Sequence, residues 1–487
     1  MRGIAGWVTH WAQQTPRAVA VITPDGTEIP YVALADRVRS VAALLARRGV
    51  TVGNRVVFCG LNRVEQIETL FACAHLGAIL VPINNRLTSG EVAHQLTDCR
   101  PTVAVAADGF DQLLIEAGAT DVIEVESRDW KSARPEEPPG RGRLERDCLL
   151  VYTSGTTGVP KGAVITQSGL LFTVLNGMAH EQFTRSSVVV AVLPFFHVGG
   201  QNIQVLPCLY AGGTVVILDR FDPARTLELL ARYRATHIVM VPAVMDAVIA
   251  HPAFAETELG SLTGIACGSS VVPEASITPF LDRDVPAVQV YGATETGPTS
   301  IVLAHAESHR IGSCGKAAMH TELRVVDSEG NDLATGLIGE IWLRGPNLFT
   351  HYWEQAEATA EVFVDGWYRT GDVGYLDAEG YVFVTGRQRE VIVSGGENIY
   401  PAEVERILGL HPHVVEVAVV GEPDPRWGEM PVAYLVATAG VDEAAVQSDL
   451  LEWCETQLAK FKRPRRWVFR SDLPKTALGK VKKHELT

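Results

Sequence analysis

Short runs of β-branched residues alternate with amphipathic stretches over most of the chain. Residues 55–58, 214–218 and 287–290 are examples of such runs, and the alternation continues to about residue 385. This pattern predicts an α/β protein in which helices cover β-sheets. With 487 residues, the chain is too long for one ordinary domain.

The pattern changes after Gly386. Pro401 is placed to open a helix, with Val404, Ile407 and Leu408 as its apolar stripe. The remaining residues predict three strands and one further helix, at 414–420, 432–437, 467–469 and 442–458. That is a compact α+β unit of roughly a hundred residues. We therefore predict a large N-terminal domain, 1–386, and a small C-terminal domain, 387–487.

Composition and charge limit which partners the chain is expected to bind and where in the cell it is expected to be. Hydrophobic residues make up 47% of the chain and charged residues 20%, and the net charge is −15. No basic field is present to attract nucleic acid or anionic lipid. The eight cysteines form no C-x-x-C pair, and the N-terminal residues lack the apolar stretch of a signal peptide. We expect reduced cysteines and a cytoplasmic location.

Residues 186–218 contain no Asp, Glu, Lys or Arg. Pro194, His197, Pro207 and a glycine pair interrupt this segment. The interruptions favour a buried strand, a loop and a buried helix over a membrane span. We expect no stable membrane insertion.

The segment 152–162, YTSGTTGVPKG, combines glycines and hydroxyl residues with Lys161 after an apolar run. Glycines let backbone N–H groups turn towards a phosphate, hydroxyls add donors, and the lysine supplies positive charge. Pro160 departs from the Walker pattern. The alternative is a surface turn rich in glycine and threonine, but the combination favours a phosphate-binding loop.

Seven further motifs follow in order: PFFH at 194–197, YGATETG at 291–297, GEIWLRGPN at 339–347, YRTGD at 368–372, GR at 386–387, SGGENIYPAE at 394–403 and PKTALGK at 474–480. Together with the loop at 152–162, they resemble the motifs of the adenylate-forming superfamily. This family includes acyl- and aryl-CoA synthetases, adenylation domains of peptide synthetases and beetle luciferases.

The resemblance implies a large N-terminal α/β domain of stacked sheets flanked by helices, followed by a small mobile α+β domain. It implies an acyl-CoA synthetase with ATP, Mg²⁺ and coenzyme A as cofactors. A carboxylic acid, fatty or aryl, would be activated to an acyl-adenylate and transferred to coenzyme A, with release of AMP and pyrophosphate. For a fatty substrate, the enzyme would belong to fatty acid metabolism.

The resemblance also implies roles for individual residues. Lys480, His197, Thr153 and Glu295 would act in catalysis, and Glu295 would bind the metal. The cofactor-binding set would comprise Thr153, Ser154, Gly155, Thr156, Thr157, Gly158, Lys161, Gly268, Ser269, Ser270, Tyr291, Gly292, Ala293, Thr294, Asp372, Arg387, Ser394, Gly395, Gly396, Glu397 and Lys480.

Residue chemistry agrees with these roles. Glu295 offers the hard oxygen that Mg²⁺ prefers, and the Asp372 carboxylate can accept from two ribose hydroxyls. A flexible ammonium at Lys480 can neutralise the charge that develops between the carboxylate and the α-phosphate. Each of these residues also has a simpler interpretation. Asp372 could be an aspartate in a turn, Arg387 could form a surface ion pair, and Lys480 could be one surface lysine among several.

Three further positions leave alternatives open. His197 can instead be a core histidine beside Phe196, whereas residues 305–309 are expected to be a solvated stretch rather than a metal site. The family hinge is usually Asp or Lys, and here that position is Arg389. The hinge motion is expected to be retained.

The acid pocket is expected to be apolar, with Phe195, Phe196 and the small residues 266–270 at its walls. The lack of acidic residues at 186–218 argues against an amino acid substrate. Two other functions remain open: an adenylation enzyme that loads a carrier protein, and a non-catalytic nucleotide sensor. The basic run 460–466 would suit either coenzyme A or an acidic carrier helix, and a homodimer is also left open.

Overall fold

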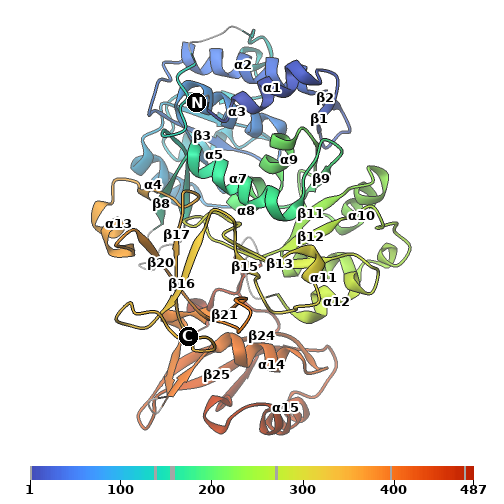
Figure 1. Ribbon diagram of the computed structural model, residues 1–487, viewed down its shortest axis with the longest axis vertical. Helices are drawn as coiled ribbons and strands as arrows, with labels where there is room; N and C mark the ends of the chain where they lie inside the picture. The colour runs from blue at the N-terminus through green and yellow to red at the C-terminus, as the bar shows by residue number, and fades with distance from the viewer. Residues whose placement is uncertain are drawn as a thin grey trace.

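The chain is built on four β-sheets (Figure 1). The computed structural model describes residues 3–135, 140–153, 160–268, 272–394, 397–476 and 479–486. Three sheets belong to the first part of the chain and one to the last hundred residues. The large and small parts predicted from the change in sequence pattern are therefore visible as separate sheets.

A nine-stranded sheet forms one layer of the large part. Its order is β15 (Lys316–Ala317), β14 (Ile301–Val302), β13 (Ala287–Tyr291), β12 (Gly264–Cys267), β11 (His237–Met240), β9 (Val188–Ala191), β10 (Thr214–Ile217), β1 (Val19–Ile22) and β2 (Glu28–Pro30). The strands from β13 to β1 are parallel, and antiparallel strands close both edges. Nearly every residue of the central strands is buried, as expected for a parallel sheet covered on both faces.

A seven-stranded sheet forms the second layer. Its order is β18 (His351–Tyr352), β8 (Lys161–Thr166), β7 (Asp147–Thr153), β4 (Ile79–Pro82), β3 (Arg55–Cys59), β5 (Val103–Ala106) and β6 (Val122–Glu124). Strands β7, β4, β3, β5 and β6 are parallel, whereas β8 and β18 are antiparallel additions. This places the phosphate-loop motif between two adjacent antiparallel strands, β7 and β8.

Helices cover both sheets. Their bounds are α1 (Gly6–Gln14), α2 (Tyr31–Arg47), α3 (Val64–Leu76), α4 (Ser89–Cys99), α5 (Asp111–Glu116), α6 (Arg128–Lys131), α7 (Gln167–Glu181), α8 (Val198–Asn202), α9 (Val205–Ala211), α10 (Pro223–Arg232), α11 (Pro242–Ala250), α12 (Glu274–Leu281) and α13 (Ala356–Val362). The segment 186–218 forms β9, α8, α9 and β10. It is thus a buried strand–helix–strand unit.

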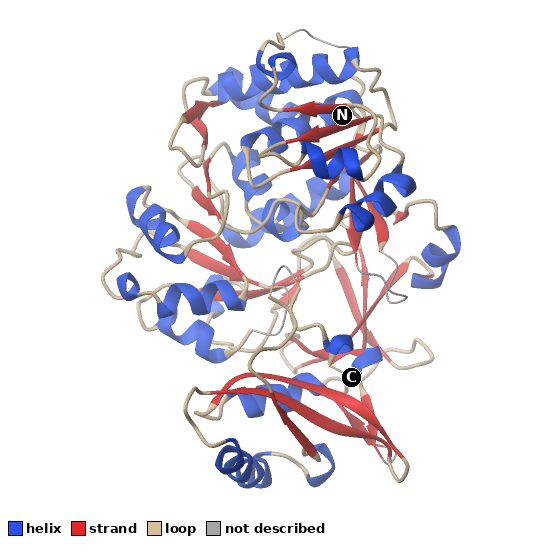
Figure 2. Cartoon of the chain, turned by 180° about the vertical axis from the view of Figure 1, so that it is seen from behind, coloured by secondary structure: helices blue, strands red, loops and turns tan. Residues whose placement is uncertain are grey.

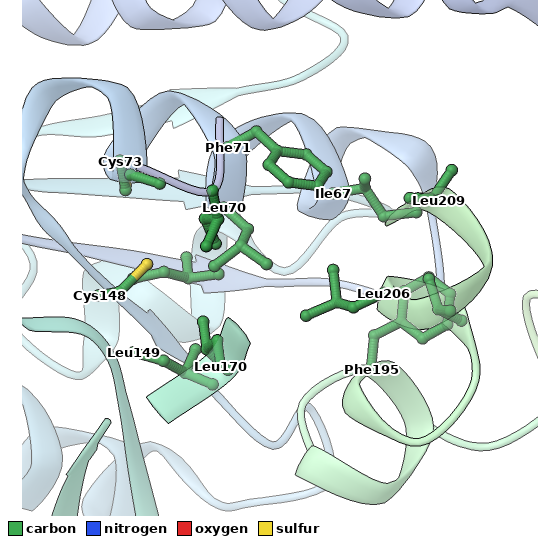
Figure 3. Close-up of a cluster of buried hydrophobic side chains, with 14 of the residues drawn as sticks. Ile67, Leu70, Phe71, Cys73, Cys148, Leu149, Leu170, Phe195, Leu206 and Leu209 are labelled. Atoms are coloured by element: carbon green, nitrogen blue, oxygen red, sulfur yellow. The ribbon is translucent and has the colours of Figure 1, made fainter. Parts of the chain in front are cut away.

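The main core lies between the two large sheets. Side chains from α3, α7 and α9 meet strands of both sheets in one cluster that includes Phe71, Leu149, Leu170 and Leu206 (Figure 3). The outer faces are covered by α10, α11 and α12 on one sheet and by α4 and α5 on the other. This confirms the α/β class and the stacked sheets flanked by helices.

Phe195 belongs to this core cluster and is 1% exposed. Its backbone is held on both sides, since its N–H donates to Asn62 Oδ1 at 2.8 Å and its carbonyl accepts from Gln66 Nε2 at 2.9 Å. The side chain is therefore packed in the core next to the segment that leads to His197, and its place at the wall of an acid pocket stays a prediction.

The third sheet is antiparallel. It consists of β16 (Glu322–Val326), β17 (Gly339–Arg344), β20 (Trp367–Leu376), β19 (Phe363–Val364) and β21 (Val382–Arg387). Strands β20 and β21 are paired so that Asp372 lies opposite Arg387. Asp372 and Arg387, both far from the phosphate loop in sequence, are thereby neighbours in the β20–β21 ladder.

The last hundred residues form an α+β unit at the end of the molecule opposite the N-terminus (Figures 1 and 2). Its sheet contains β23 (Glu397–Ile399), β22 (Ile392–Ser394), β25 (Gly428–Ala437), β24 (Val414–Asp424) and β26 (Arg466–Phe469). Helices α14 (Pro401–Gly409) and α15 (Glu443–Gln457) pack on one face of this sheet. The predicted stripe of Val404, Ile407 and Leu408 is buried there, which confirms that helix.

Strands β24 and β25 are longer than their apolar runs predicted. The hairpin extends over polar residues such as Glu422 and Glu429, because backbone pairing does not require buried side chains.

The boundary at 386/387 falls at the end of β21 and stays a prediction, as does the mobility of the small domain. Among the described helices, none combines the length and apolarity needed to cross a bilayer.

His305 is not the solvated residue expected from its sequence context. It lies in the 3₁₀ turn η2 (His305–Glu307), with its Nε2 at 3.7 Å from Oε2 of the fully buried Glu181 at the end of α7. His237 Nε2 contacts the Glu181 carbonyl at 2.7 Å, and Gln204 donates to the carboxylate at 3.3 Å. Burial opposes the charge of both partners, yet their attraction raises the pKa of His305 and lowers the pKa of Glu181.

This pair predicts a pH-dependent contribution to stability. The raised pKa of His305 stabilises the fold below its usual value of 6.5 and loses effect as pH rises through the folded value. The lowered pKa of Glu181 stabilises above 4.5 and loses effect as pH falls through the folded value. Replacing His305→Gln should therefore reduce the free energy of unfolding more at about pH 6 than at about pH 9. Chemical denaturation at both pH values measures this, and an equal loss at both would contradict the ion pair.

Candidate active site

The predicted site residues approach one another where the large sheets meet the antiparallel sheet. Thr153 ends β7, Tyr291 ends β13 and Gly268 follows β12, so all three lie at the carboxyl ends of strands. Asp372 and Arg387 come from β20 and β21. In open α/β sheets, ligands bind at the carboxyl ends of the strands.

The first group surrounds Glu295. Its Oε1 accepts a hydrogen bond from Thr153 Oγ1 at 3.0 Å and another from Tyr352 OH at 3.2 Å. Its backbone carbonyl accepts from Phe349 N at 2.8 Å. The carboxylate is thus held in place by two strands, β7 and β18, that the sequence separates by about 200 residues.

Lys161 lies beside this group. It is the first residue of β8, opposite Thr153 in the β7–β8 ladder, and its Nζ lies 5.3 Å from the centroid of the Tyr352 ring. A cation over an aromatic face is attracted by the ring electrons. Ser154, Gly155, Thr156, Thr157 and Gly158, which connect the two strands, lie outside the described residues.

The loop after β13 is built for close backbone packing. A Cβ added to Gly292 would lie 2.2 Å from the Gly297 carbonyl oxygen, so no larger residue fits there. Gly297 has φ +75°, and the Ala293 N–H donates to Thr296 Oγ1 at 2.8 Å. Asn347 donates to the Thr296 carbonyl at 2.7 Å. These contacts fix the path on which Gly292, Ala293, Thr294 and Glu295 lie.

The second group surrounds Asp372, which is 7% exposed. Its Oδ2 accepts from Tyr291 OH at 2.6 Å, and its Oδ1 forms an ion pair with Arg387 Nε at 2.5 Å. Burial and the adjacent Asp372 charge raise the pKa of Tyr291. Burial alone would lower the pKa of Arg387, but Asp372 and Tyr291 raise it overall. Asp372 is thus a paired carboxylate between two sheets rather than an aspartate in a simple turn.

Lys480 is brought to this second group from the small domain. It interacts electrostatically with Arg387 and Asp372, more than ninety residues earlier in the chain. A Cβ on the adjacent Gly479 would lie 3.1 Å from the Ala243 Cβ in α11. Lys480 is exposed, yet partial loss of solvation and then the Arg387 charge lower its pKa, against the opposing effect of Glu390.

His197 precedes α8 and is nearly enclosed. Burial and then the positive charge of Arg86 lower its pKa to about 4, so the imidazole is neutral near neutral pH. Its Nε2 has no hydrogen-bond partner among the described residues, and the same holds for Gln201 Nε2 one helical turn later. A buried polar atom without a partner is costly, and a ligand or water commonly supplies the bond.

The remaining predicted residues are less closely connected. Ser394 is buried at the end of β22, and Glu397 is exposed at the start of β23, opposite Ser394 in the hairpin. Within the described ranges, no hydrogen bond or ion pair joins His197, Gly268, Ser394 or Glu397 to the two groups above. Ser269, Ser270, Gly395 and Gly396 lie outside the described residues.

Sequence reasoning missed Tyr352 and Tyr368. Tyr352 joins Lys161 and Glu295, and Tyr368 lies close enough to both Glu295 and Tyr352 that burial and their charges raise its pKa. The sequence signal for Tyr368 was present, because it begins the YRTGD motif. Tyr352 had no local signal, since only the pairing of β18 with β8 brings it to the site.

The fit of Mg²⁺ can be judged from the donor set. No group of three His, Cys, Asp or Glu side chains that could hold a metal occurs in the described part of the chain. Mg²⁺ commonly uses one or two carboxylates together with substrate phosphates. Glu295, with Lys161 and Thr153 nearby, fits that arrangement.

The Asp372–Arg387 pair, Lys161 of the phosphate-loop motif and Lys480 of the C-terminal tail lie in the arrangement that ATP-dependent activation of a carboxylate would require. The sequence profile of the AMP-binding enzyme family matches residues 8–353, and that of the AMP-binding enzyme C-terminal domain matches residues 403–480. The chain belongs to the AMP-binding enzyme family.

Relatives of known activity match over the full length. An indoleacetate–CoA ligase from Aromatoleum aromaticum is 39% identical, with 99% of this chain and 97% of the relative covered. A feruloyl-CoA synthase from an Amycolatopsis species is 38% identical, with 100% and 98% covered. The structure of an o-succinylbenzoate–CoA synthetase from Bacillus subtilis with its acyl-adenylate superposes with a TM-score of 0.90 at 31% identity, covering 99% and 97%.

These similarities identify an AMP-forming acid–CoA ligase. Its cofactors are ATP, Mg²⁺ and coenzyme A, as the sequence motifs implied. The residue roles remain predictions that the geometry above makes testable.

Asp372→Asn tests the second group. Removing the charge should leave Arg387 without its ion pair and should weaken the acceptance of ribose hydroxyls. We expect the Kd for MgATP to rise about 10- to 100-fold, the range of one charged hydrogen bond. Titration calorimetry measures the change. Glu379→Gln, an exposed carboxylate paired with Arg310, is the control; unchanged affinity in Asp372→Asn would contradict the role.

Proposed function

We propose that the chain activates an aryl carboxylic acid and transfers it to coenzyme A. The observation that carries this proposal is full-length similarity to ligases named for indoleacetate and ferulate. The unpartnered His197 Nε2 and Gln201 Nε2 add support. A phenol oxygen of an aryl acid could accept from Gln201 Nε2, and a ring N–H could donate to His197 Nε2 in the tautomer in which that nitrogen accepts, whereas an alkyl chain could do neither.

The reaction proceeds in two steps. An oxygen of the acid attacks the α-phosphorus of ATP, and pyrophosphate leaves with the electrons of the broken P–O bond. The sulfur of coenzyme A then attacks the acyl carbon, AMP leaves, and the thiol proton is released. Lys161 and Lys480 bring positive charge to the first step, while Asp372 and Arg387 hold the ribose. Glu295 would hold Mg²⁺, which would supply positive charge to neutralise the phosphates of ATP.

The acceptor in this proposal is coenzyme A. Trp427 in the β24–β25 turn has two guanidinium groups close to its ring, those of Arg426 and Arg465, each 4.7 Å from the ring centroid. Arg465 belongs to the basic run 460–466. An aromatic ring flanked by arginines suits the adenine and phosphates at the nucleotide end of coenzyme A. Ser394 and Glu397 would approach the thiol after the small domain rotates about Arg389.

A substrate panel tests the acid class. Pyrophosphate release is measured with MgATP and indolyl, hydroxylated aryl, unsubstituted aryl, fatty and amino acids, with and without coenzyme A. We expect the largest kcat/KM with an indolyl or hydroxylated aryl acid, and acyl-CoA and AMP as products.

Two other outcomes of this panel would replace the proposal. Preference for fatty acids would place the enzyme in fatty acid metabolism. Pyrophosphate exchange without acyl-CoA, restored by a phosphopantetheinylated carrier protein, would assign the carrier as acceptor. A cytoplasmic location and a homodimer stay predictions, for fractionation and light scattering to test.

Lys480→Ala tests the division of the two steps. Adenylate formation should fall by about 100-fold or more, while thioester formation from supplied acyl-adenylate and coenzyme A should remain largely intact. Lys482→Ala, which removes an ammonium paired with Glu485, serves as the control. Equal loss of both half-reactions in Lys480→Ala would remove the role assigned to Lys480.

A further inference from the structure

A second lysine of the C-terminal tail lies between two carboxylates. Lys483 Nζ is 2.7 Å from Glu405 Oε1 and 3.5 Å from Glu390 Oε2. The three side chains are only 21%, 21% and 25% exposed, so their charges are partly withdrawn from water. Screening is weaker for such pairs than for ions on the open surface.

The three residues come from three separate segments. Glu390 ends the 3₁₀ turn η3 (Gln388–Glu390), which directly follows Arg387. Glu405 lies in α14, and its Oε1 also accepts from Val419 N in β24 at 2.7 Å. Lys483 begins the 3₁₀ turn η5 (Lys483–Glu485). One ammonium therefore links the tail to the predicted hinge and to the body of the small domain.

The same tail presents Lys480. Thr476 N donates to the Lys480 carbonyl at 2.7 Å, and Lys480 N donates to Thr476 Oγ1 at 3.2 Å, which closes a turn. Leu473, Val481 and Leu486 bury their side chains against the sheet on either side of that turn. The backbone of Lys480 is thereby held, but these contacts do not determine where its long side chain points.

Glu390 acts on both lysines. It forms the ion pair with Lys483, and it also attracts Lys480, opposing the lowered pKa of that residue. The Lys480 charge is thus attracted by two carboxylates, Glu390 in the hinge segment and Asp372 beside Arg387, both of which oppose its lowered pKa. Partly buried carboxylates that lose their cation gain strongly from any other cation in reach.

We propose that Lys483 is a positioning residue for adenylate formation. It occupies Glu390 and Glu405, and this leaves the Lys480 ammonium to face the Asp372–Arg387 pair. The inference rests on the role proposed above for Lys480. It adds that the two tail lysines have different roles. Lys483 neutralises the carboxylates of Glu390 and Glu405, and Lys480 supplies positive charge for adenylate formation.

The test compares the two half-reactions in Lys483→Met. Pyrophosphate exchange, which reports adenylate formation, should fall about 10- to 100-fold, the loss expected when a reacting group is displaced by about an ångström. Thioester formation from supplied acyl-adenylate and coenzyme A should stay within about twofold of the wild type. Lys483→Arg, which keeps the charge, should restore exchange. Lys482→Met is the matched control, because it removes an ammonium one residue away that pairs with Glu485 instead.

A double variant separates capture of Lys480 from general damage. If Glu390 captures Lys480 when Lys483 is absent, Lys483→Met combined with Glu390→Gln should regain most of the lost exchange activity. Equal loss of both half-reactions in Lys483→Met, or no recovery in the double variant, would overturn the proposal. Thermal unfolding verifies that each variant is folded, and Lys483→Gln replaces Lys483→Met if the latter is not.

Lys480→Ala, measured in parallel, distinguishes failure of the role proposed for Lys480 from failure of the role proposed for Lys483. If it leaves pyrophosphate exchange intact, the role of Lys480 fails and the role of Lys483 falls with it. If Lys480→Ala abolishes exchange but Lys483→Met matches the wild type, only the positioning role of Lys483 is refuted.

Discussion

The site depends on how one buried carboxylate is neutralised. Asp372 is almost fully enclosed, and a charged group in that position requires hydrogen bonds and an opposite charge. Tyr291 supplies the hydrogen bond from the nine-stranded sheet, and Arg387 supplies the charge from the strand paired with β20. The hydrogen bond from Tyr291 joins the nine-stranded sheet to the antiparallel sheet that contains both Asp372 and Arg387, so the arrangement that stabilises Asp372 also links these two sheets.

The layered fold places the other functional groups around that junction. Thr153 ends β7, Tyr291 ends β13 and Gly268 directly follows β12, on the side where parallel sheets bind ligands. The core between the large sheets contains few groups that can move, because α3, α7 and α9 are tightly packed there. In the proposed mechanism, the large domain holds ATP and the acid, while the smaller unit would supply Lys480 for the first step and withdraw it for the second.

The site gathers positively charged side chains in a chain whose overall charge is negative. The chain carries fifteen more acidic than basic residues by formal count, yet its substrates are anionic. Lys161, Arg387 and Lys480 therefore have to act locally, and each has a named neighbour: Tyr352, Asp372 and the Asp372–Arg387 pair. The cluster of Lys483 with Glu390 and Glu405 extends the same principle to the tail, where neutralising nearby carboxylates is as important as supplying positive charge.

The sequence by itself determined the elements, the two-part organisation and the chemistry of the motifs. Residue periodicity predicted α14 with Val404, Ile407 and Leu408 buried, because the α-helical repeat is a local property. Only the tertiary structure decided that Tyr352 contacts Glu295, that His305 faces Glu181, and that the charges of Asp372 and Arg387 act on Lys480. Those contacts follow from the order of strands in the sheets and from the placement of the small domain. Both are set by packing between segments far apart in the chain, which a local pattern of residues does not encode.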